Sequence, residues 1–531
     1  MSHKIFIFLF TYFFIIFSCI GFGNFFLRYS NLKNNFFCIG NRGIFGIFFL
    51  IIYSYLSHYL YPHTQFHNLA VLLIGFFLLL IFFQDFERKD FINTIFIFLI
   101  IFIGLLFYKT HDDFPYYHFP YTFNLTQNTI IFGIGKINHG FKTPSSIFYL
   151  NSLFYLPIIK YYTFSIGAAL VLGFSNLIFL KIILDKLKIK RVDFIFYFSL
   201  LSFAFVNVFF YRLSEHGTDR SAMILIFIFF INILIFIENF KKNTQDMVAQ
   251  IAVLISLIIS FKAFYILYSI FIIPLVFYLI KNNKVIVKNS FKNIYLYISI
   301  LLILLVSLSY FINTGCFLYP VILTCVENTE WSLSMDLINK MGEWYQIWSK
   351  GGAGPNFRVE NPTEYIKGFN WVPNWIEIYF FNKVSDFILG ILFLSVIFLI
   401  TFNKFKIKKK NIFFYNPDAF RQIMILYILI LFLLFEWFYN HPALRYGGYV
   451  IFALIVFIPL SVFLSRVNYN KKFYIKTYFL IFLTLIIFFL RNSHRIYKEM
   501  RVYSYEPITE PYYFIDNHHF RIDKKLKKKI E

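Results

Sequence analysis

The chain has 531 residues, of which 59% are hydrophobic, 23% are aromatic and only 15% are charged. This composition excludes a soluble globular protein, because a chain of this size could not bury so much apolar surface. The formal net charge is +23, which in a soluble protein would suggest nucleic acid as a partner. Here the basic residues lie in short clusters between apolar segments, so they indicate orientation in a membrane, and no nucleic acid is expected as a partner.

Apolar segments of helical length recur along the chain and predict an all-α fold, a polytopic bundle of about 14 transmembrane spans. The expected spans are 4–22, 44–60, 69–83, 91–108, 160–180, 194–211, 221–238, 248–261, 263–280, 294–312, 386–402, 422–439, 449–464 and 474–490. Several are short for a full bilayer, so tilting or local thinning is expected. The first segment lacks a small-residue cleavage site and is interpreted as a span rather than a signal peptide.

Lysine and arginine residues predict which loops face the cytoplasm. Basic clusters occupy alternate loops, for example at 181–191, 241–242, 281–292, 404–410 and 466–472. With these loops in the cytoplasm, both ends of the chain fall outside. The assignment requires 248–280 to form two short helices that meet near Lys262. The sequence therefore predicts a multi-pass protein of the inner (plasma) membrane with an extracytoplasmic active face.

This topology divides the chain into four regions. Residues 1–312 form an N-terminal membrane region with outer loops at 109–159 and 211–220, residues 313–385 a large outer loop, residues 386–490 the C-terminal membrane helices and residues 491–531 a basic tail. Residues 440–447 face the same outer side. The segment 146–157 is too short to span, and it is predicted to lie as a helix in the outer interface with its aromatic side chains at headgroup depth.

The first long polar interruption, within 109–159, concentrates groups that can carry chemistry. Asp112 and Asp113 directly follow an apolar span, and a carboxylate pair there can deprotonate a hydroxyl group or hold a divalent metal ion. His111 and His118 flank the pair and Tyr117 adds an aromatic face. These residues predict a catalytic and substrate-binding site. The sequence does not decide whether this site holds a metal ion. The alternative is a solvated boundary loop, where acidic residues are common.

The second outer loop, 211–220, is short and highly polar. Six of its ten residues can carry charge or titrate, and they lie between two very apolar helices. Anchoring at the interface would explain Arg212 and Arg220. It would not explain Glu215, His216 and Asp219 together. We therefore expect the loop to fold over the first acidic pair.

Two isolated cations are the candidate binders of a phosphate or pyrophosphate group. Arg445 lies between Pro442 and the Gly447-Gly448 pair, and a planar guanidinium suits phosphate oxygens. Lys262 lies at the predicted outer hairpin. The alternatives are that Glu436 neutralises Arg445 and that Lys262 only extends toward the interface.

The large outer loop contains Cys316 and Cys325, whose short separation outside the membrane predicts a disulfide. Five tryptophans in this loop could stack on sugar rings or anchor the loop at the interface: Trp331, Trp344, Trp348, Trp371 and Trp375. The glycine-rich segment 351–356 lacks the ending of a phosphate-binding loop, so a flexible lid is the better interpretation.

The early acidic pair, the second acidic outer loop and the late outer arginine together resemble the GT-C glycosyltransferase superfamily. Enzymes of that superfamily are polytopic and take sugars from polyprenyl-phosphate donors on the outer side of the membrane. The resemblance implies that its acidic motif corresponds to Asp112 and Asp113, its second acidic loop to Glu215 and Asp219, and its interface helix to 146–157. The stretches DDFPYYHFPYT, TPSSIFYLNSLFYLP and EHGTDR also resemble an uncharacterised bacterial family of large membrane proteins.

The leading hypothesis is an inverting membrane glycosyltransferase that moves a sugar from a polyprenyl-phosphate donor to a hydroxyl group of a glycan or lipid acceptor. Asp112 or Asp113 would activate the hydroxyl, while Lys262 and Arg445 would stabilise the leaving phosphate. An enzyme resembling O-antigen polymerases and ligases, a lipid-linked-sugar flippase or transporter, and an assembly role are the alternatives.

The hypothesis makes a prediction about geometry. One of the first two aspartates should lie within roughly 10–12 Å of Glu215 or Asp219, so that a small substrate can bridge them. Arg445 or Lys262 should border the same cavity, and the loop 313–385 should cover it.

Overall fold

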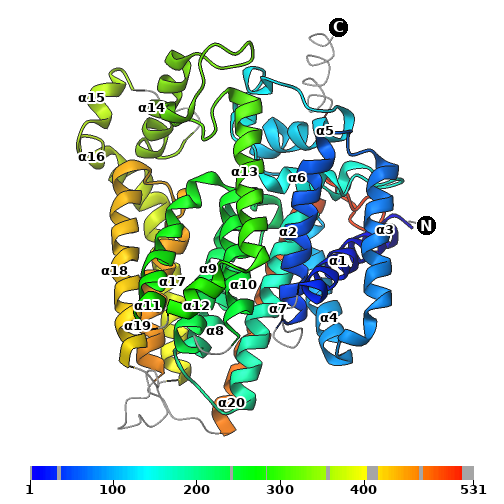
Figure 1. The fold of residues 1–531 in the computed structure, drawn as a ribbon, viewed down its shortest axis with the longest axis vertical. Helices are drawn as coiled ribbons and strands as arrows, with labels where there is room; N and C mark the ends of the chain where they lie inside the picture. The colour runs from blue at the N-terminus through cyan, green and yellow to red at the C-terminus, as the bar shows by residue number, and fades with distance from the viewer. Residues whose placement is uncertain are drawn as a thin grey trace.

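The structure of the chain is a computed structural model that describes residues 3–30, 32, 37–239, 243–282, 284–354, 359–402, 417–465 and 471–516. These residues form helices and no β-sheet, with two isolated bridges at Leu156–Lys160 and Cys316–Cys325. Most of the long helices lie close to vertical in Figure 1, and the short helices α5, α6, α14, α15 and α16 gather toward the top. We call this end the upper end; it carries the loops that the sequence assigns to the outer side.

Helices occur at all of the expected spans. Their bounds are α1 (Lys4–Tyr29), α2 (Ile39–His58), α3 (Gln65–Ile81), α4 (Arg88–Leu105), α7 (Ile166–Lys188), α8 (Phe194–Phe209), α9 (Asp219–Asn239), α10 (Thr244–Phe261), α11 (Ile272–Asn282), α13 (Ile294–Thr314), α17 (Ser385–Phe402), α18 (Pro417–Asn440), α19 (Gly448–Leu464) and α20 (Lys471–Tyr503). Within the described ranges, 10 helices are long and apolar enough to cross a membrane, and α3, α8 and α19 are shorter apolar helices. The all-helical architecture of the described residues is confirmed, and the apolar helices indicate a multi-pass membrane protein, while the number of crossings stays a prediction.

The chain reverses direction at Lys262, as the orientation argument requires. Helix α10 ends at Phe261, and Lys262 has an extended backbone with φ −152° and ψ 109°. The 3-10 segment η8 (Ala263–Phe271) then leads into α11. Gln245, at the start of α10, donates to the carbonyl oxygen of Asn289 over 2.8 Å, so the segment that follows α11 returns to the level at which α10 begins. Several of the basic clusters used for orientation lie outside the described residues, namely those at 241–242 and 404–410 and the part of the cluster 466–472 up to residue 470. The final lysine-rich run also lies outside them.

The segment 146–157 is not an interface helix. Helix α6 (Ser146–Ser152) is shorter than expected, and every one of its residues is buried inside the protein. Ser54 of α2 donates to the carbonyl oxygen of Tyr149 over 2.6 Å, and Tyr55 bonds to Ser146 over 3.0 Å. The aromatic side chains that suggested headgroup contact therefore pack inside the helix bundle.

The predicted large loop, 313–385, is mostly helical. It contains α14 (Met335–Lys350), α15 (Pro362–Ile366) and α16 (Val372–Trp375), which lie at the upper end in Figure 1. Helical structure then continues through the π-helical segment η10 (Ile376–Val384) into α17, so this candidate span begins earlier than expected. Cys316 and Cys325 form a disulfide with Cα atoms 3.8 Å apart, closer than the usual range of about 4.4–6.8 Å.

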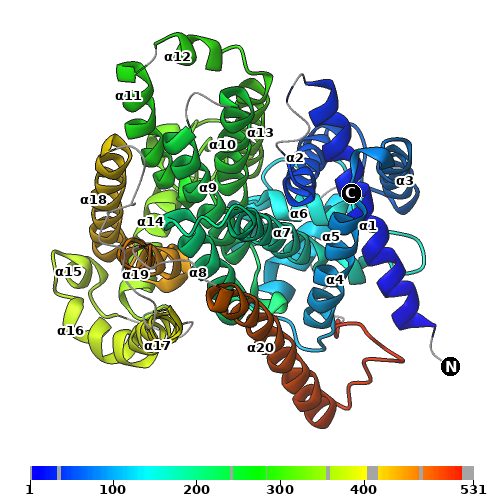
Figure 2. The same ribbon diagram turned by 90° about the horizontal axis from the view of Figure 1, so that it is seen from below.

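The C-terminal tail also begins later than expected. Helix α20 continues through Tyr503, well past the predicted end of the last span at residue 490. Seen from below in Figure 2, α20 lies at the edge of the bundle, with α8 and α4 on its inner side. This extension carries charged residues to the upper end of the protein.

Helices α1 and α2 approach each other so closely that side chains are excluded at their crossing. A Cβ added to Gly46 would lie 1.8 Å from the carbonyl oxygen of Cys19, and one added to Gly23 would lie 1.7 Å from that of Arg42. Small residues commonly permit such contacts between membrane helices. The glycines therefore hold the N-terminal helix against the rest of the bundle.

Replacing Gly46 by Ala should lower the free energy of unfolding by about 1–3 kcal/mol, because the added methyl group forces α1 and α2 apart. Thermal unfolding of the purified protein in detergent micelles measures this change. Gly342→Ala is the matched control, since no atom lies within 4 Å of a Cβ at that position. Equal unfolding temperatures for Gly46→Ala and the wild type would contradict the close packing of these helices.

Candidate functional site

Arg445 lies between two carboxylates from distant parts of the chain. Its Nη2 donates to Oδ2 of Asp113 over 2.9 Å, and its Nε donates to Oδ2 of Asp219 over 3.1 Å. The Nζ atom of Lys262 lies 3.0 Å from Oδ1 of Asp219. We call these four side chains the charge cluster. Its two cations and two carboxylates alternate in sign and balance each other.

Each member of the charge cluster lies at the end of a structural element. Asp113 precedes the π-helical turn η3 (Phe114–His118), and Asp219 is the first residue of α9. Lys262 caps α10 at the hairpin, and Arg445 belongs to the 3-10 turn η11 (Leu444–Tyr446) before α19. A carboxylate in the first turn of a helix also meets the positive end of the helix dipole. The helices thus bring four charges together at one level of the bundle.

A cavity of about 250 Å³ adjoins the charge cluster. Its lining includes Asp113, Asp219 and Arg445 of the cluster, together with His111, His118, Ser214, Glu215, His216, Gly217, Thr218, Arg220, Met223, Trp348, Ala353, Tyr379, Lys383 and Tyr449. We call it the first cavity. Its volume suits a sugar-sized ligand, and residues between 313 and 385 form part of its wall.

Two histidines that line the first cavity each have a buried ring nitrogen without a hydrogen-bond partner among the described residues. The side chains of His118 and His216 are 9% and 1% exposed, and Nε2 of His118 and Nδ1 of His216 have no partner among the described residues. The other ring nitrogen of His216 bonds to the carbonyl oxygen of Phe210 over 2.6 Å. Buried polar atoms in native proteins are normally hydrogen-bonded, so these nitrogens are suited to a polar ligand.

Burial and neighbouring charges determine the protonation of the first cavity. Burial lowers the pKa of both His118 and His216 to about 3, so both rings are neutral at neutral pH. Burial would raise the pKa of Asp113, but Arg445 and the nearby histidines outweigh it and leave this pKa below its usual value. Burial would lower the pKa of Arg445, but Asp219 and Asp113 raise it well above the ordinary value. The cavity therefore presents one ionised carboxylate-guanidinium network and two neutral imidazoles.

Glu215 is held by two arginines. Its carboxylate oxygens lie 2.7 Å from Arg212 and 2.9 Å from Arg220. Burial would raise its pKa, but Arg220 and Arg212 lower it overall. Glu215 lines the first cavity as an ionised group, and its two partners favour a positioning role over that of a base.

Gly217 allows the second outer loop to pass close to His118. The residue has φ +49°, in the left-handed region, and a Cβ at this position would lie 2.9 Å from Cε1 of His118. Glycine alone adopts this backbone conformation without a steric penalty. The loop 211–220 thereby folds against the segment that contains Asp113, as the sequence predicts.

The structure separates the two adjacent aspartates. Asp113 joins the charge cluster, whereas Asp112 is exposed and lines a neighbouring cavity. His111 lines both cavities, and its Nδ1 accepts from the backbone N–H of Asp113 over 3.1 Å. Tyr117 does not line the first cavity; its ring packs against His118 with centroids 4.3 Å apart.

Glu436 is not the partner of Arg445. Its Oε1 accepts from Asn440 over 3.0 Å, while the guanidinium binds Asp113 and Asp219. Of the five tryptophans considered for sugar stacking, Trp348 alone lines the first cavity. Trp371 and Trp375 are buried and pack against Phe438.

Sequence reasoning missed several residues of the site. Tyr379 and Lys383 of η10 line the first cavity, and the Tyr379 hydroxyl accepts from the backbone N–H of Leu444 over 2.9 Å. Nothing in their local pattern distinguishes them from other residues near a membrane surface. Arg495 and Lys498 line the neighbouring cavity. The polar run after residue 490 was the signal available for them.

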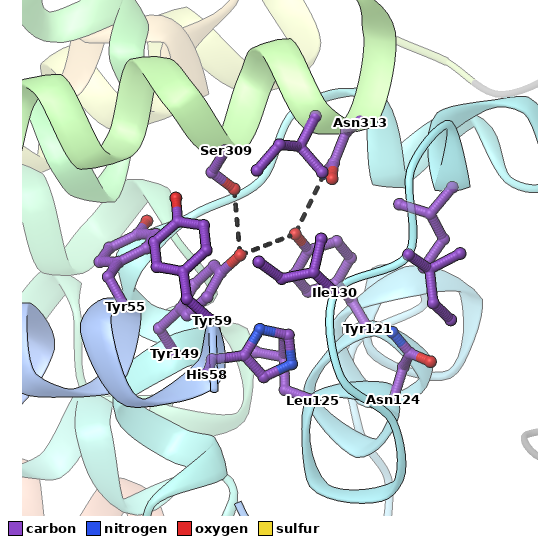
Figure 3. A pocket seen from close by; sticks show the side chains of 13 residues that line it. Tyr55, His58, Tyr59, Tyr121, Asn124, Leu125, Ile130, Tyr149, Ser309 and Asn313 are labelled. Carbon is purple, nitrogen blue, oxygen red and sulfur yellow. Dashed lines mark hydrogen bonds between the residues drawn. The ribbon is translucent and has the colours of Figure 1, made fainter. Parts of the chain in front are cut away.

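A smaller buried pocket lies beside α13 and is shown in Figure 3. The hydroxyl of Tyr149 bonds to Ser309 over 3.0 Å, and Asn313 donates to the hydroxyl of Tyr121 over 3.0 Å. The pocket holds about 20 Å³, which is enough for roughly one water molecule. This network ties α5 (Phe119–Gln127) and α6 to α13, and thereby supports the segment that carries Asp113.

No group of three or more His, Cys, Asp or Glu side chains in the described ranges is arranged to hold a metal ion. The carboxylate of Asp113, which was a candidate for such a role together with Asp112, is directed at Arg445, and that of Asp219 is directed at Arg445 and Lys262. In this structure their partners are cationic side chains.

Comparison with known proteins identifies the family but no activity. A family model described as "Domain of unknown function (DUF8201)" matches residues 5–452. No curated protein and no solved structure matches the chain. The matched region includes the whole charge cluster and ends before α20. Because the match covers most of its length, the chain belongs to the DUF8201 family.

Proposed function

We propose that the protein is a membrane glycosyltransferase that moves a sugar from a polyprenyl-phosphate donor to an acceptor hydroxyl group, with inversion at the anomeric carbon. The observation that carries the proposal is the convergence of Asp113, Asp219, Lys262 and Arg445 beside one cavity. Such a site combines a carboxylate base with cations for a phosphate leaving group. It also agrees with the resemblance to GT-C enzymes.

Asp113 is the better candidate for the base. Its side chain is 25% exposed and meets one cation of the charge cluster, whereas Asp219 is 10% exposed and meets both. Asp113 takes the proton of the acceptor hydroxyl as the oxygen attacks the anomeric carbon. The bond between that carbon and the phosphate oxygen breaks, and the phosphate leaves with the electron pair. Asp219 holds Lys262 and Arg445 in position, so that these cations stabilise the negative charge on the leaving phosphate.

The pairing between Arg445 and Asp113 links donor binding to catalysis. While Arg445 donates to Asp113, it stabilises the carboxylate and weakens it as a base. A donor phosphate attracts the same guanidinium, because phosphate oxygens accept bidentate hydrogen bonds from arginine. Movement of Arg445 toward the phosphate therefore raises the basicity of Asp113 when the donor is bound.

The active face is the upper end of the protein, on the extracytoplasmic side of the inner membrane. Partners are the polyprenyl-phosphate-linked sugar, membrane lipid and a glycan or lipid acceptor.

Enzymes similar to O-antigen ligases would share this donor class and differ in the acceptor. A lipid-linked-sugar flippase would need charged groups along a path through the membrane, whereas the charge cluster lies at helix ends.

The test is a transfer assay with the purified full-length protein in liposomes that contain a labelled polyprenyl-phosphate sugar and membrane lipid extract. The expected result is consumption of the donor and appearance of the label on a second product. Asp336→Asn is the control, because this carboxylate is 72% exposed on α14 and pairs with Lys340 away from the cavity. Movement of intact donor between leaflets, without consumption, would support a flippase and overturn the proposal.

The pH dependence of transfer should reflect the environment of Asp113. Because the pKa of Asp113 in the ligand-free protein is below its usual value, the carboxylate stays ionised to unusually acidic pH. The acid limb of kcat/KM, which reports ionisations of the free enzyme, should therefore lie below about 3.9, the ordinary value for aspartate. A measured acid limb above that value, with the protein still folded by circular dichroism, would contradict Asp113 as the base.

A further inference from the structure

The strongest feature outside the charge cluster is the neighbouring cavity that contains Asp112. It has a volume of about 370 Å³ and lies between the end of α4, the loop 211–220 and the upper part of α20. We call it the second cavity. It shares His111, Ser214 and Glu215 with the first cavity, so the two adjoin each other.

Arg495 is the residue that indicates a ligand. It is 8% exposed, and its Nη2 donates to the carbonyl oxygen of Leu106 over 2.8 Å. Its Nε and Nη1 have no hydrogen-bond partner among the described residues. Leaving donors of a buried charged group unpaired is costly. Arg495 lines the second cavity, so its guanidinium, whose two unpaired donors are buried in this structure, is suited to the oxygens of an anion.

The charges around Arg495 favour an anion over a cation. Four cations line the second cavity, namely Lys109, Arg212, Arg495 and Lys498, against the three carboxylates of Asp112, Glu215 and Glu499. Arg212 and Glu215 form an ion pair over 2.7 Å, which leaves the three cations Lys109, Arg495 and Lys498 against the carboxylates of Asp112 and Glu499. Glu499 accepts from the backbone N–H of Tyr108 over 2.7 Å. The positive groups therefore exceed the carboxylates that can neutralise them.

The depth of the second cavity points to a lipid. The apolar part of α20 ends near Leu490, and Arg495 and Lys498 follow by five and eight residues. At 1.5 Å per residue they lie about 8 and 12 Å along the helix beyond its apolar part, at and just beyond the outer edge of the headgroup layer, which long basic side chains can reach. Val502 and Tyr503, which line the same cavity, are 59% and 40% exposed and offer apolar surface beside it.

We infer that the second cavity binds the phosphate group of a membrane lipid, and that this lipid is the acceptor whose hydroxyl group reaches the first cavity. The two adjoining cavities hold the two substrates of one transfer reaction. The role as acceptor rests on the proposed glycosyltransferase function, whereas lipid binding by Arg495 and Lys498 can be measured without turnover.

The test measures binding of phosphatidic acid to the full-length protein in phosphatidylcholine nanodiscs by native mass spectrometry. Lys498→Gln should weaken binding about five- to ten-fold, since one cation near a lipid phosphate contributes on that scale. Arg495→Gln should weaken it further. Arg501→Gln is the matched control, because Arg501 lies on the same helix with its guanidinium over Tyr497 and does not line the cavity.

The outcomes separate this inference from the proposed function. If Lys498→Gln, which is exposed and should fold normally, retains phosphatidic acid like the wild type, the site is wrong whatever the transfer assay shows. Inorganic phosphate that binds as well as phosphatidic acid would overturn the assignment to a lipid. Loss of lipid binding in Lys498→Gln, in a protein that shows no sugar transfer, would support the site and reject the glycosyltransferase.

Discussion

Replacing Asp113 by Asn should reduce the rate of sugar transfer by about 10²–10⁴-fold, because the amide cannot accept the proton of the acceptor hydroxyl. The amide oxygen still fills the same space beside Arg445, so the protein should insert and fold. The measurement is kcat for transfer from a polyprenyl-phosphate sugar in liposomes. The loss should appear in kcat rather than in donor affinity, since Asp113 acts during the chemical step.

Asp112→Asn is the informative comparison for this prediction. The two residues are adjacent, but Asp112 makes no contact with the charge cluster and lines the second cavity. Its replacement should cost less than about ten-fold in kcat, because a solvated carboxylate beside the site contributes weakly. If Asp112→Asn loses more activity than Asp113→Asn, the assignment of the base is wrong.

Replacing Arg445 by Gln should lower the free energy of unfolding by about 3–5 kcal/mol, in addition to abolishing transfer. The guanidinium lies between Asp113 and Asp219, and its removal leaves Asp113 with the His111 ring 3.6 Å away and Asp219 with Lys262 and the Thr218 hydroxyl. Breaking a buried ion pair on one side is strongly destabilising because a buried charge is left uncompensated. Denaturant or thermal unfolding in detergent micelles measures the effect.

A double variant shows whether the destabilisation arises from unpaired charge. Adding Asp219→Asn to Arg445→Gln removes one of the buried carboxylates that has lost its guanidinium partner, and it should recover a substantial part of the lost stability. Lys340→Gln is the control for removing a surface cation, because its pair with Asp336 has side chains 69% and 72% exposed. Simple addition of the two single losses in the double variant would contradict a coupled cluster.

The membrane helices could be predicted from the sequence because a bilayer imposes one long apolar segment for each helix. The break at Lys262 was also predictable, since a charge between two apolar runs favours a turn at the surface. Helix α6 was placed wrongly because apolar and aromatic side chains look the same whether they meet lipid or protein. The extension of α20 was missed because hydropathy marks only the apolar part of a helix.

The sequence predicted which residues form the candidate site, but it did not predict which of their side chains pair with each other. Asp113, Asp219 and Arg445 were all candidates, yet the bond between Arg445 and Asp113 joins residues 332 positions apart. Local spacing instead suggested Glu436, one helix turn from the loop. The different positions of Asp112 and Asp113 likewise depend on the backbone conformation at the start of η3. Two adjacent aspartates in the sequence do not predict that conformation.

The cations beside the two cavities differ in whether side chains of the protein already neutralise them. Arg445 and Lys262 are already balanced by carboxylates, so a ligand there must compete with an internal network. Arg495 has donors that no described residue satisfies. In the first cavity, a donor phosphate would draw Arg445 away and so free Asp113 to act as the base. In the second cavity, Arg495 would only need to bind the phosphate of the acceptor.

The most direct measurement is an experimental structure of the full-length protein with a non-hydrolysable polyprenyl-phosphate sugar. The proposed mechanism requires that the phosphate lies against Arg445 and that this side chain has left Asp113, whose carboxylate then faces the sugar in the first cavity. A ligand bound elsewhere, with Arg445 still bridging Asp113 and Asp219, would contradict it.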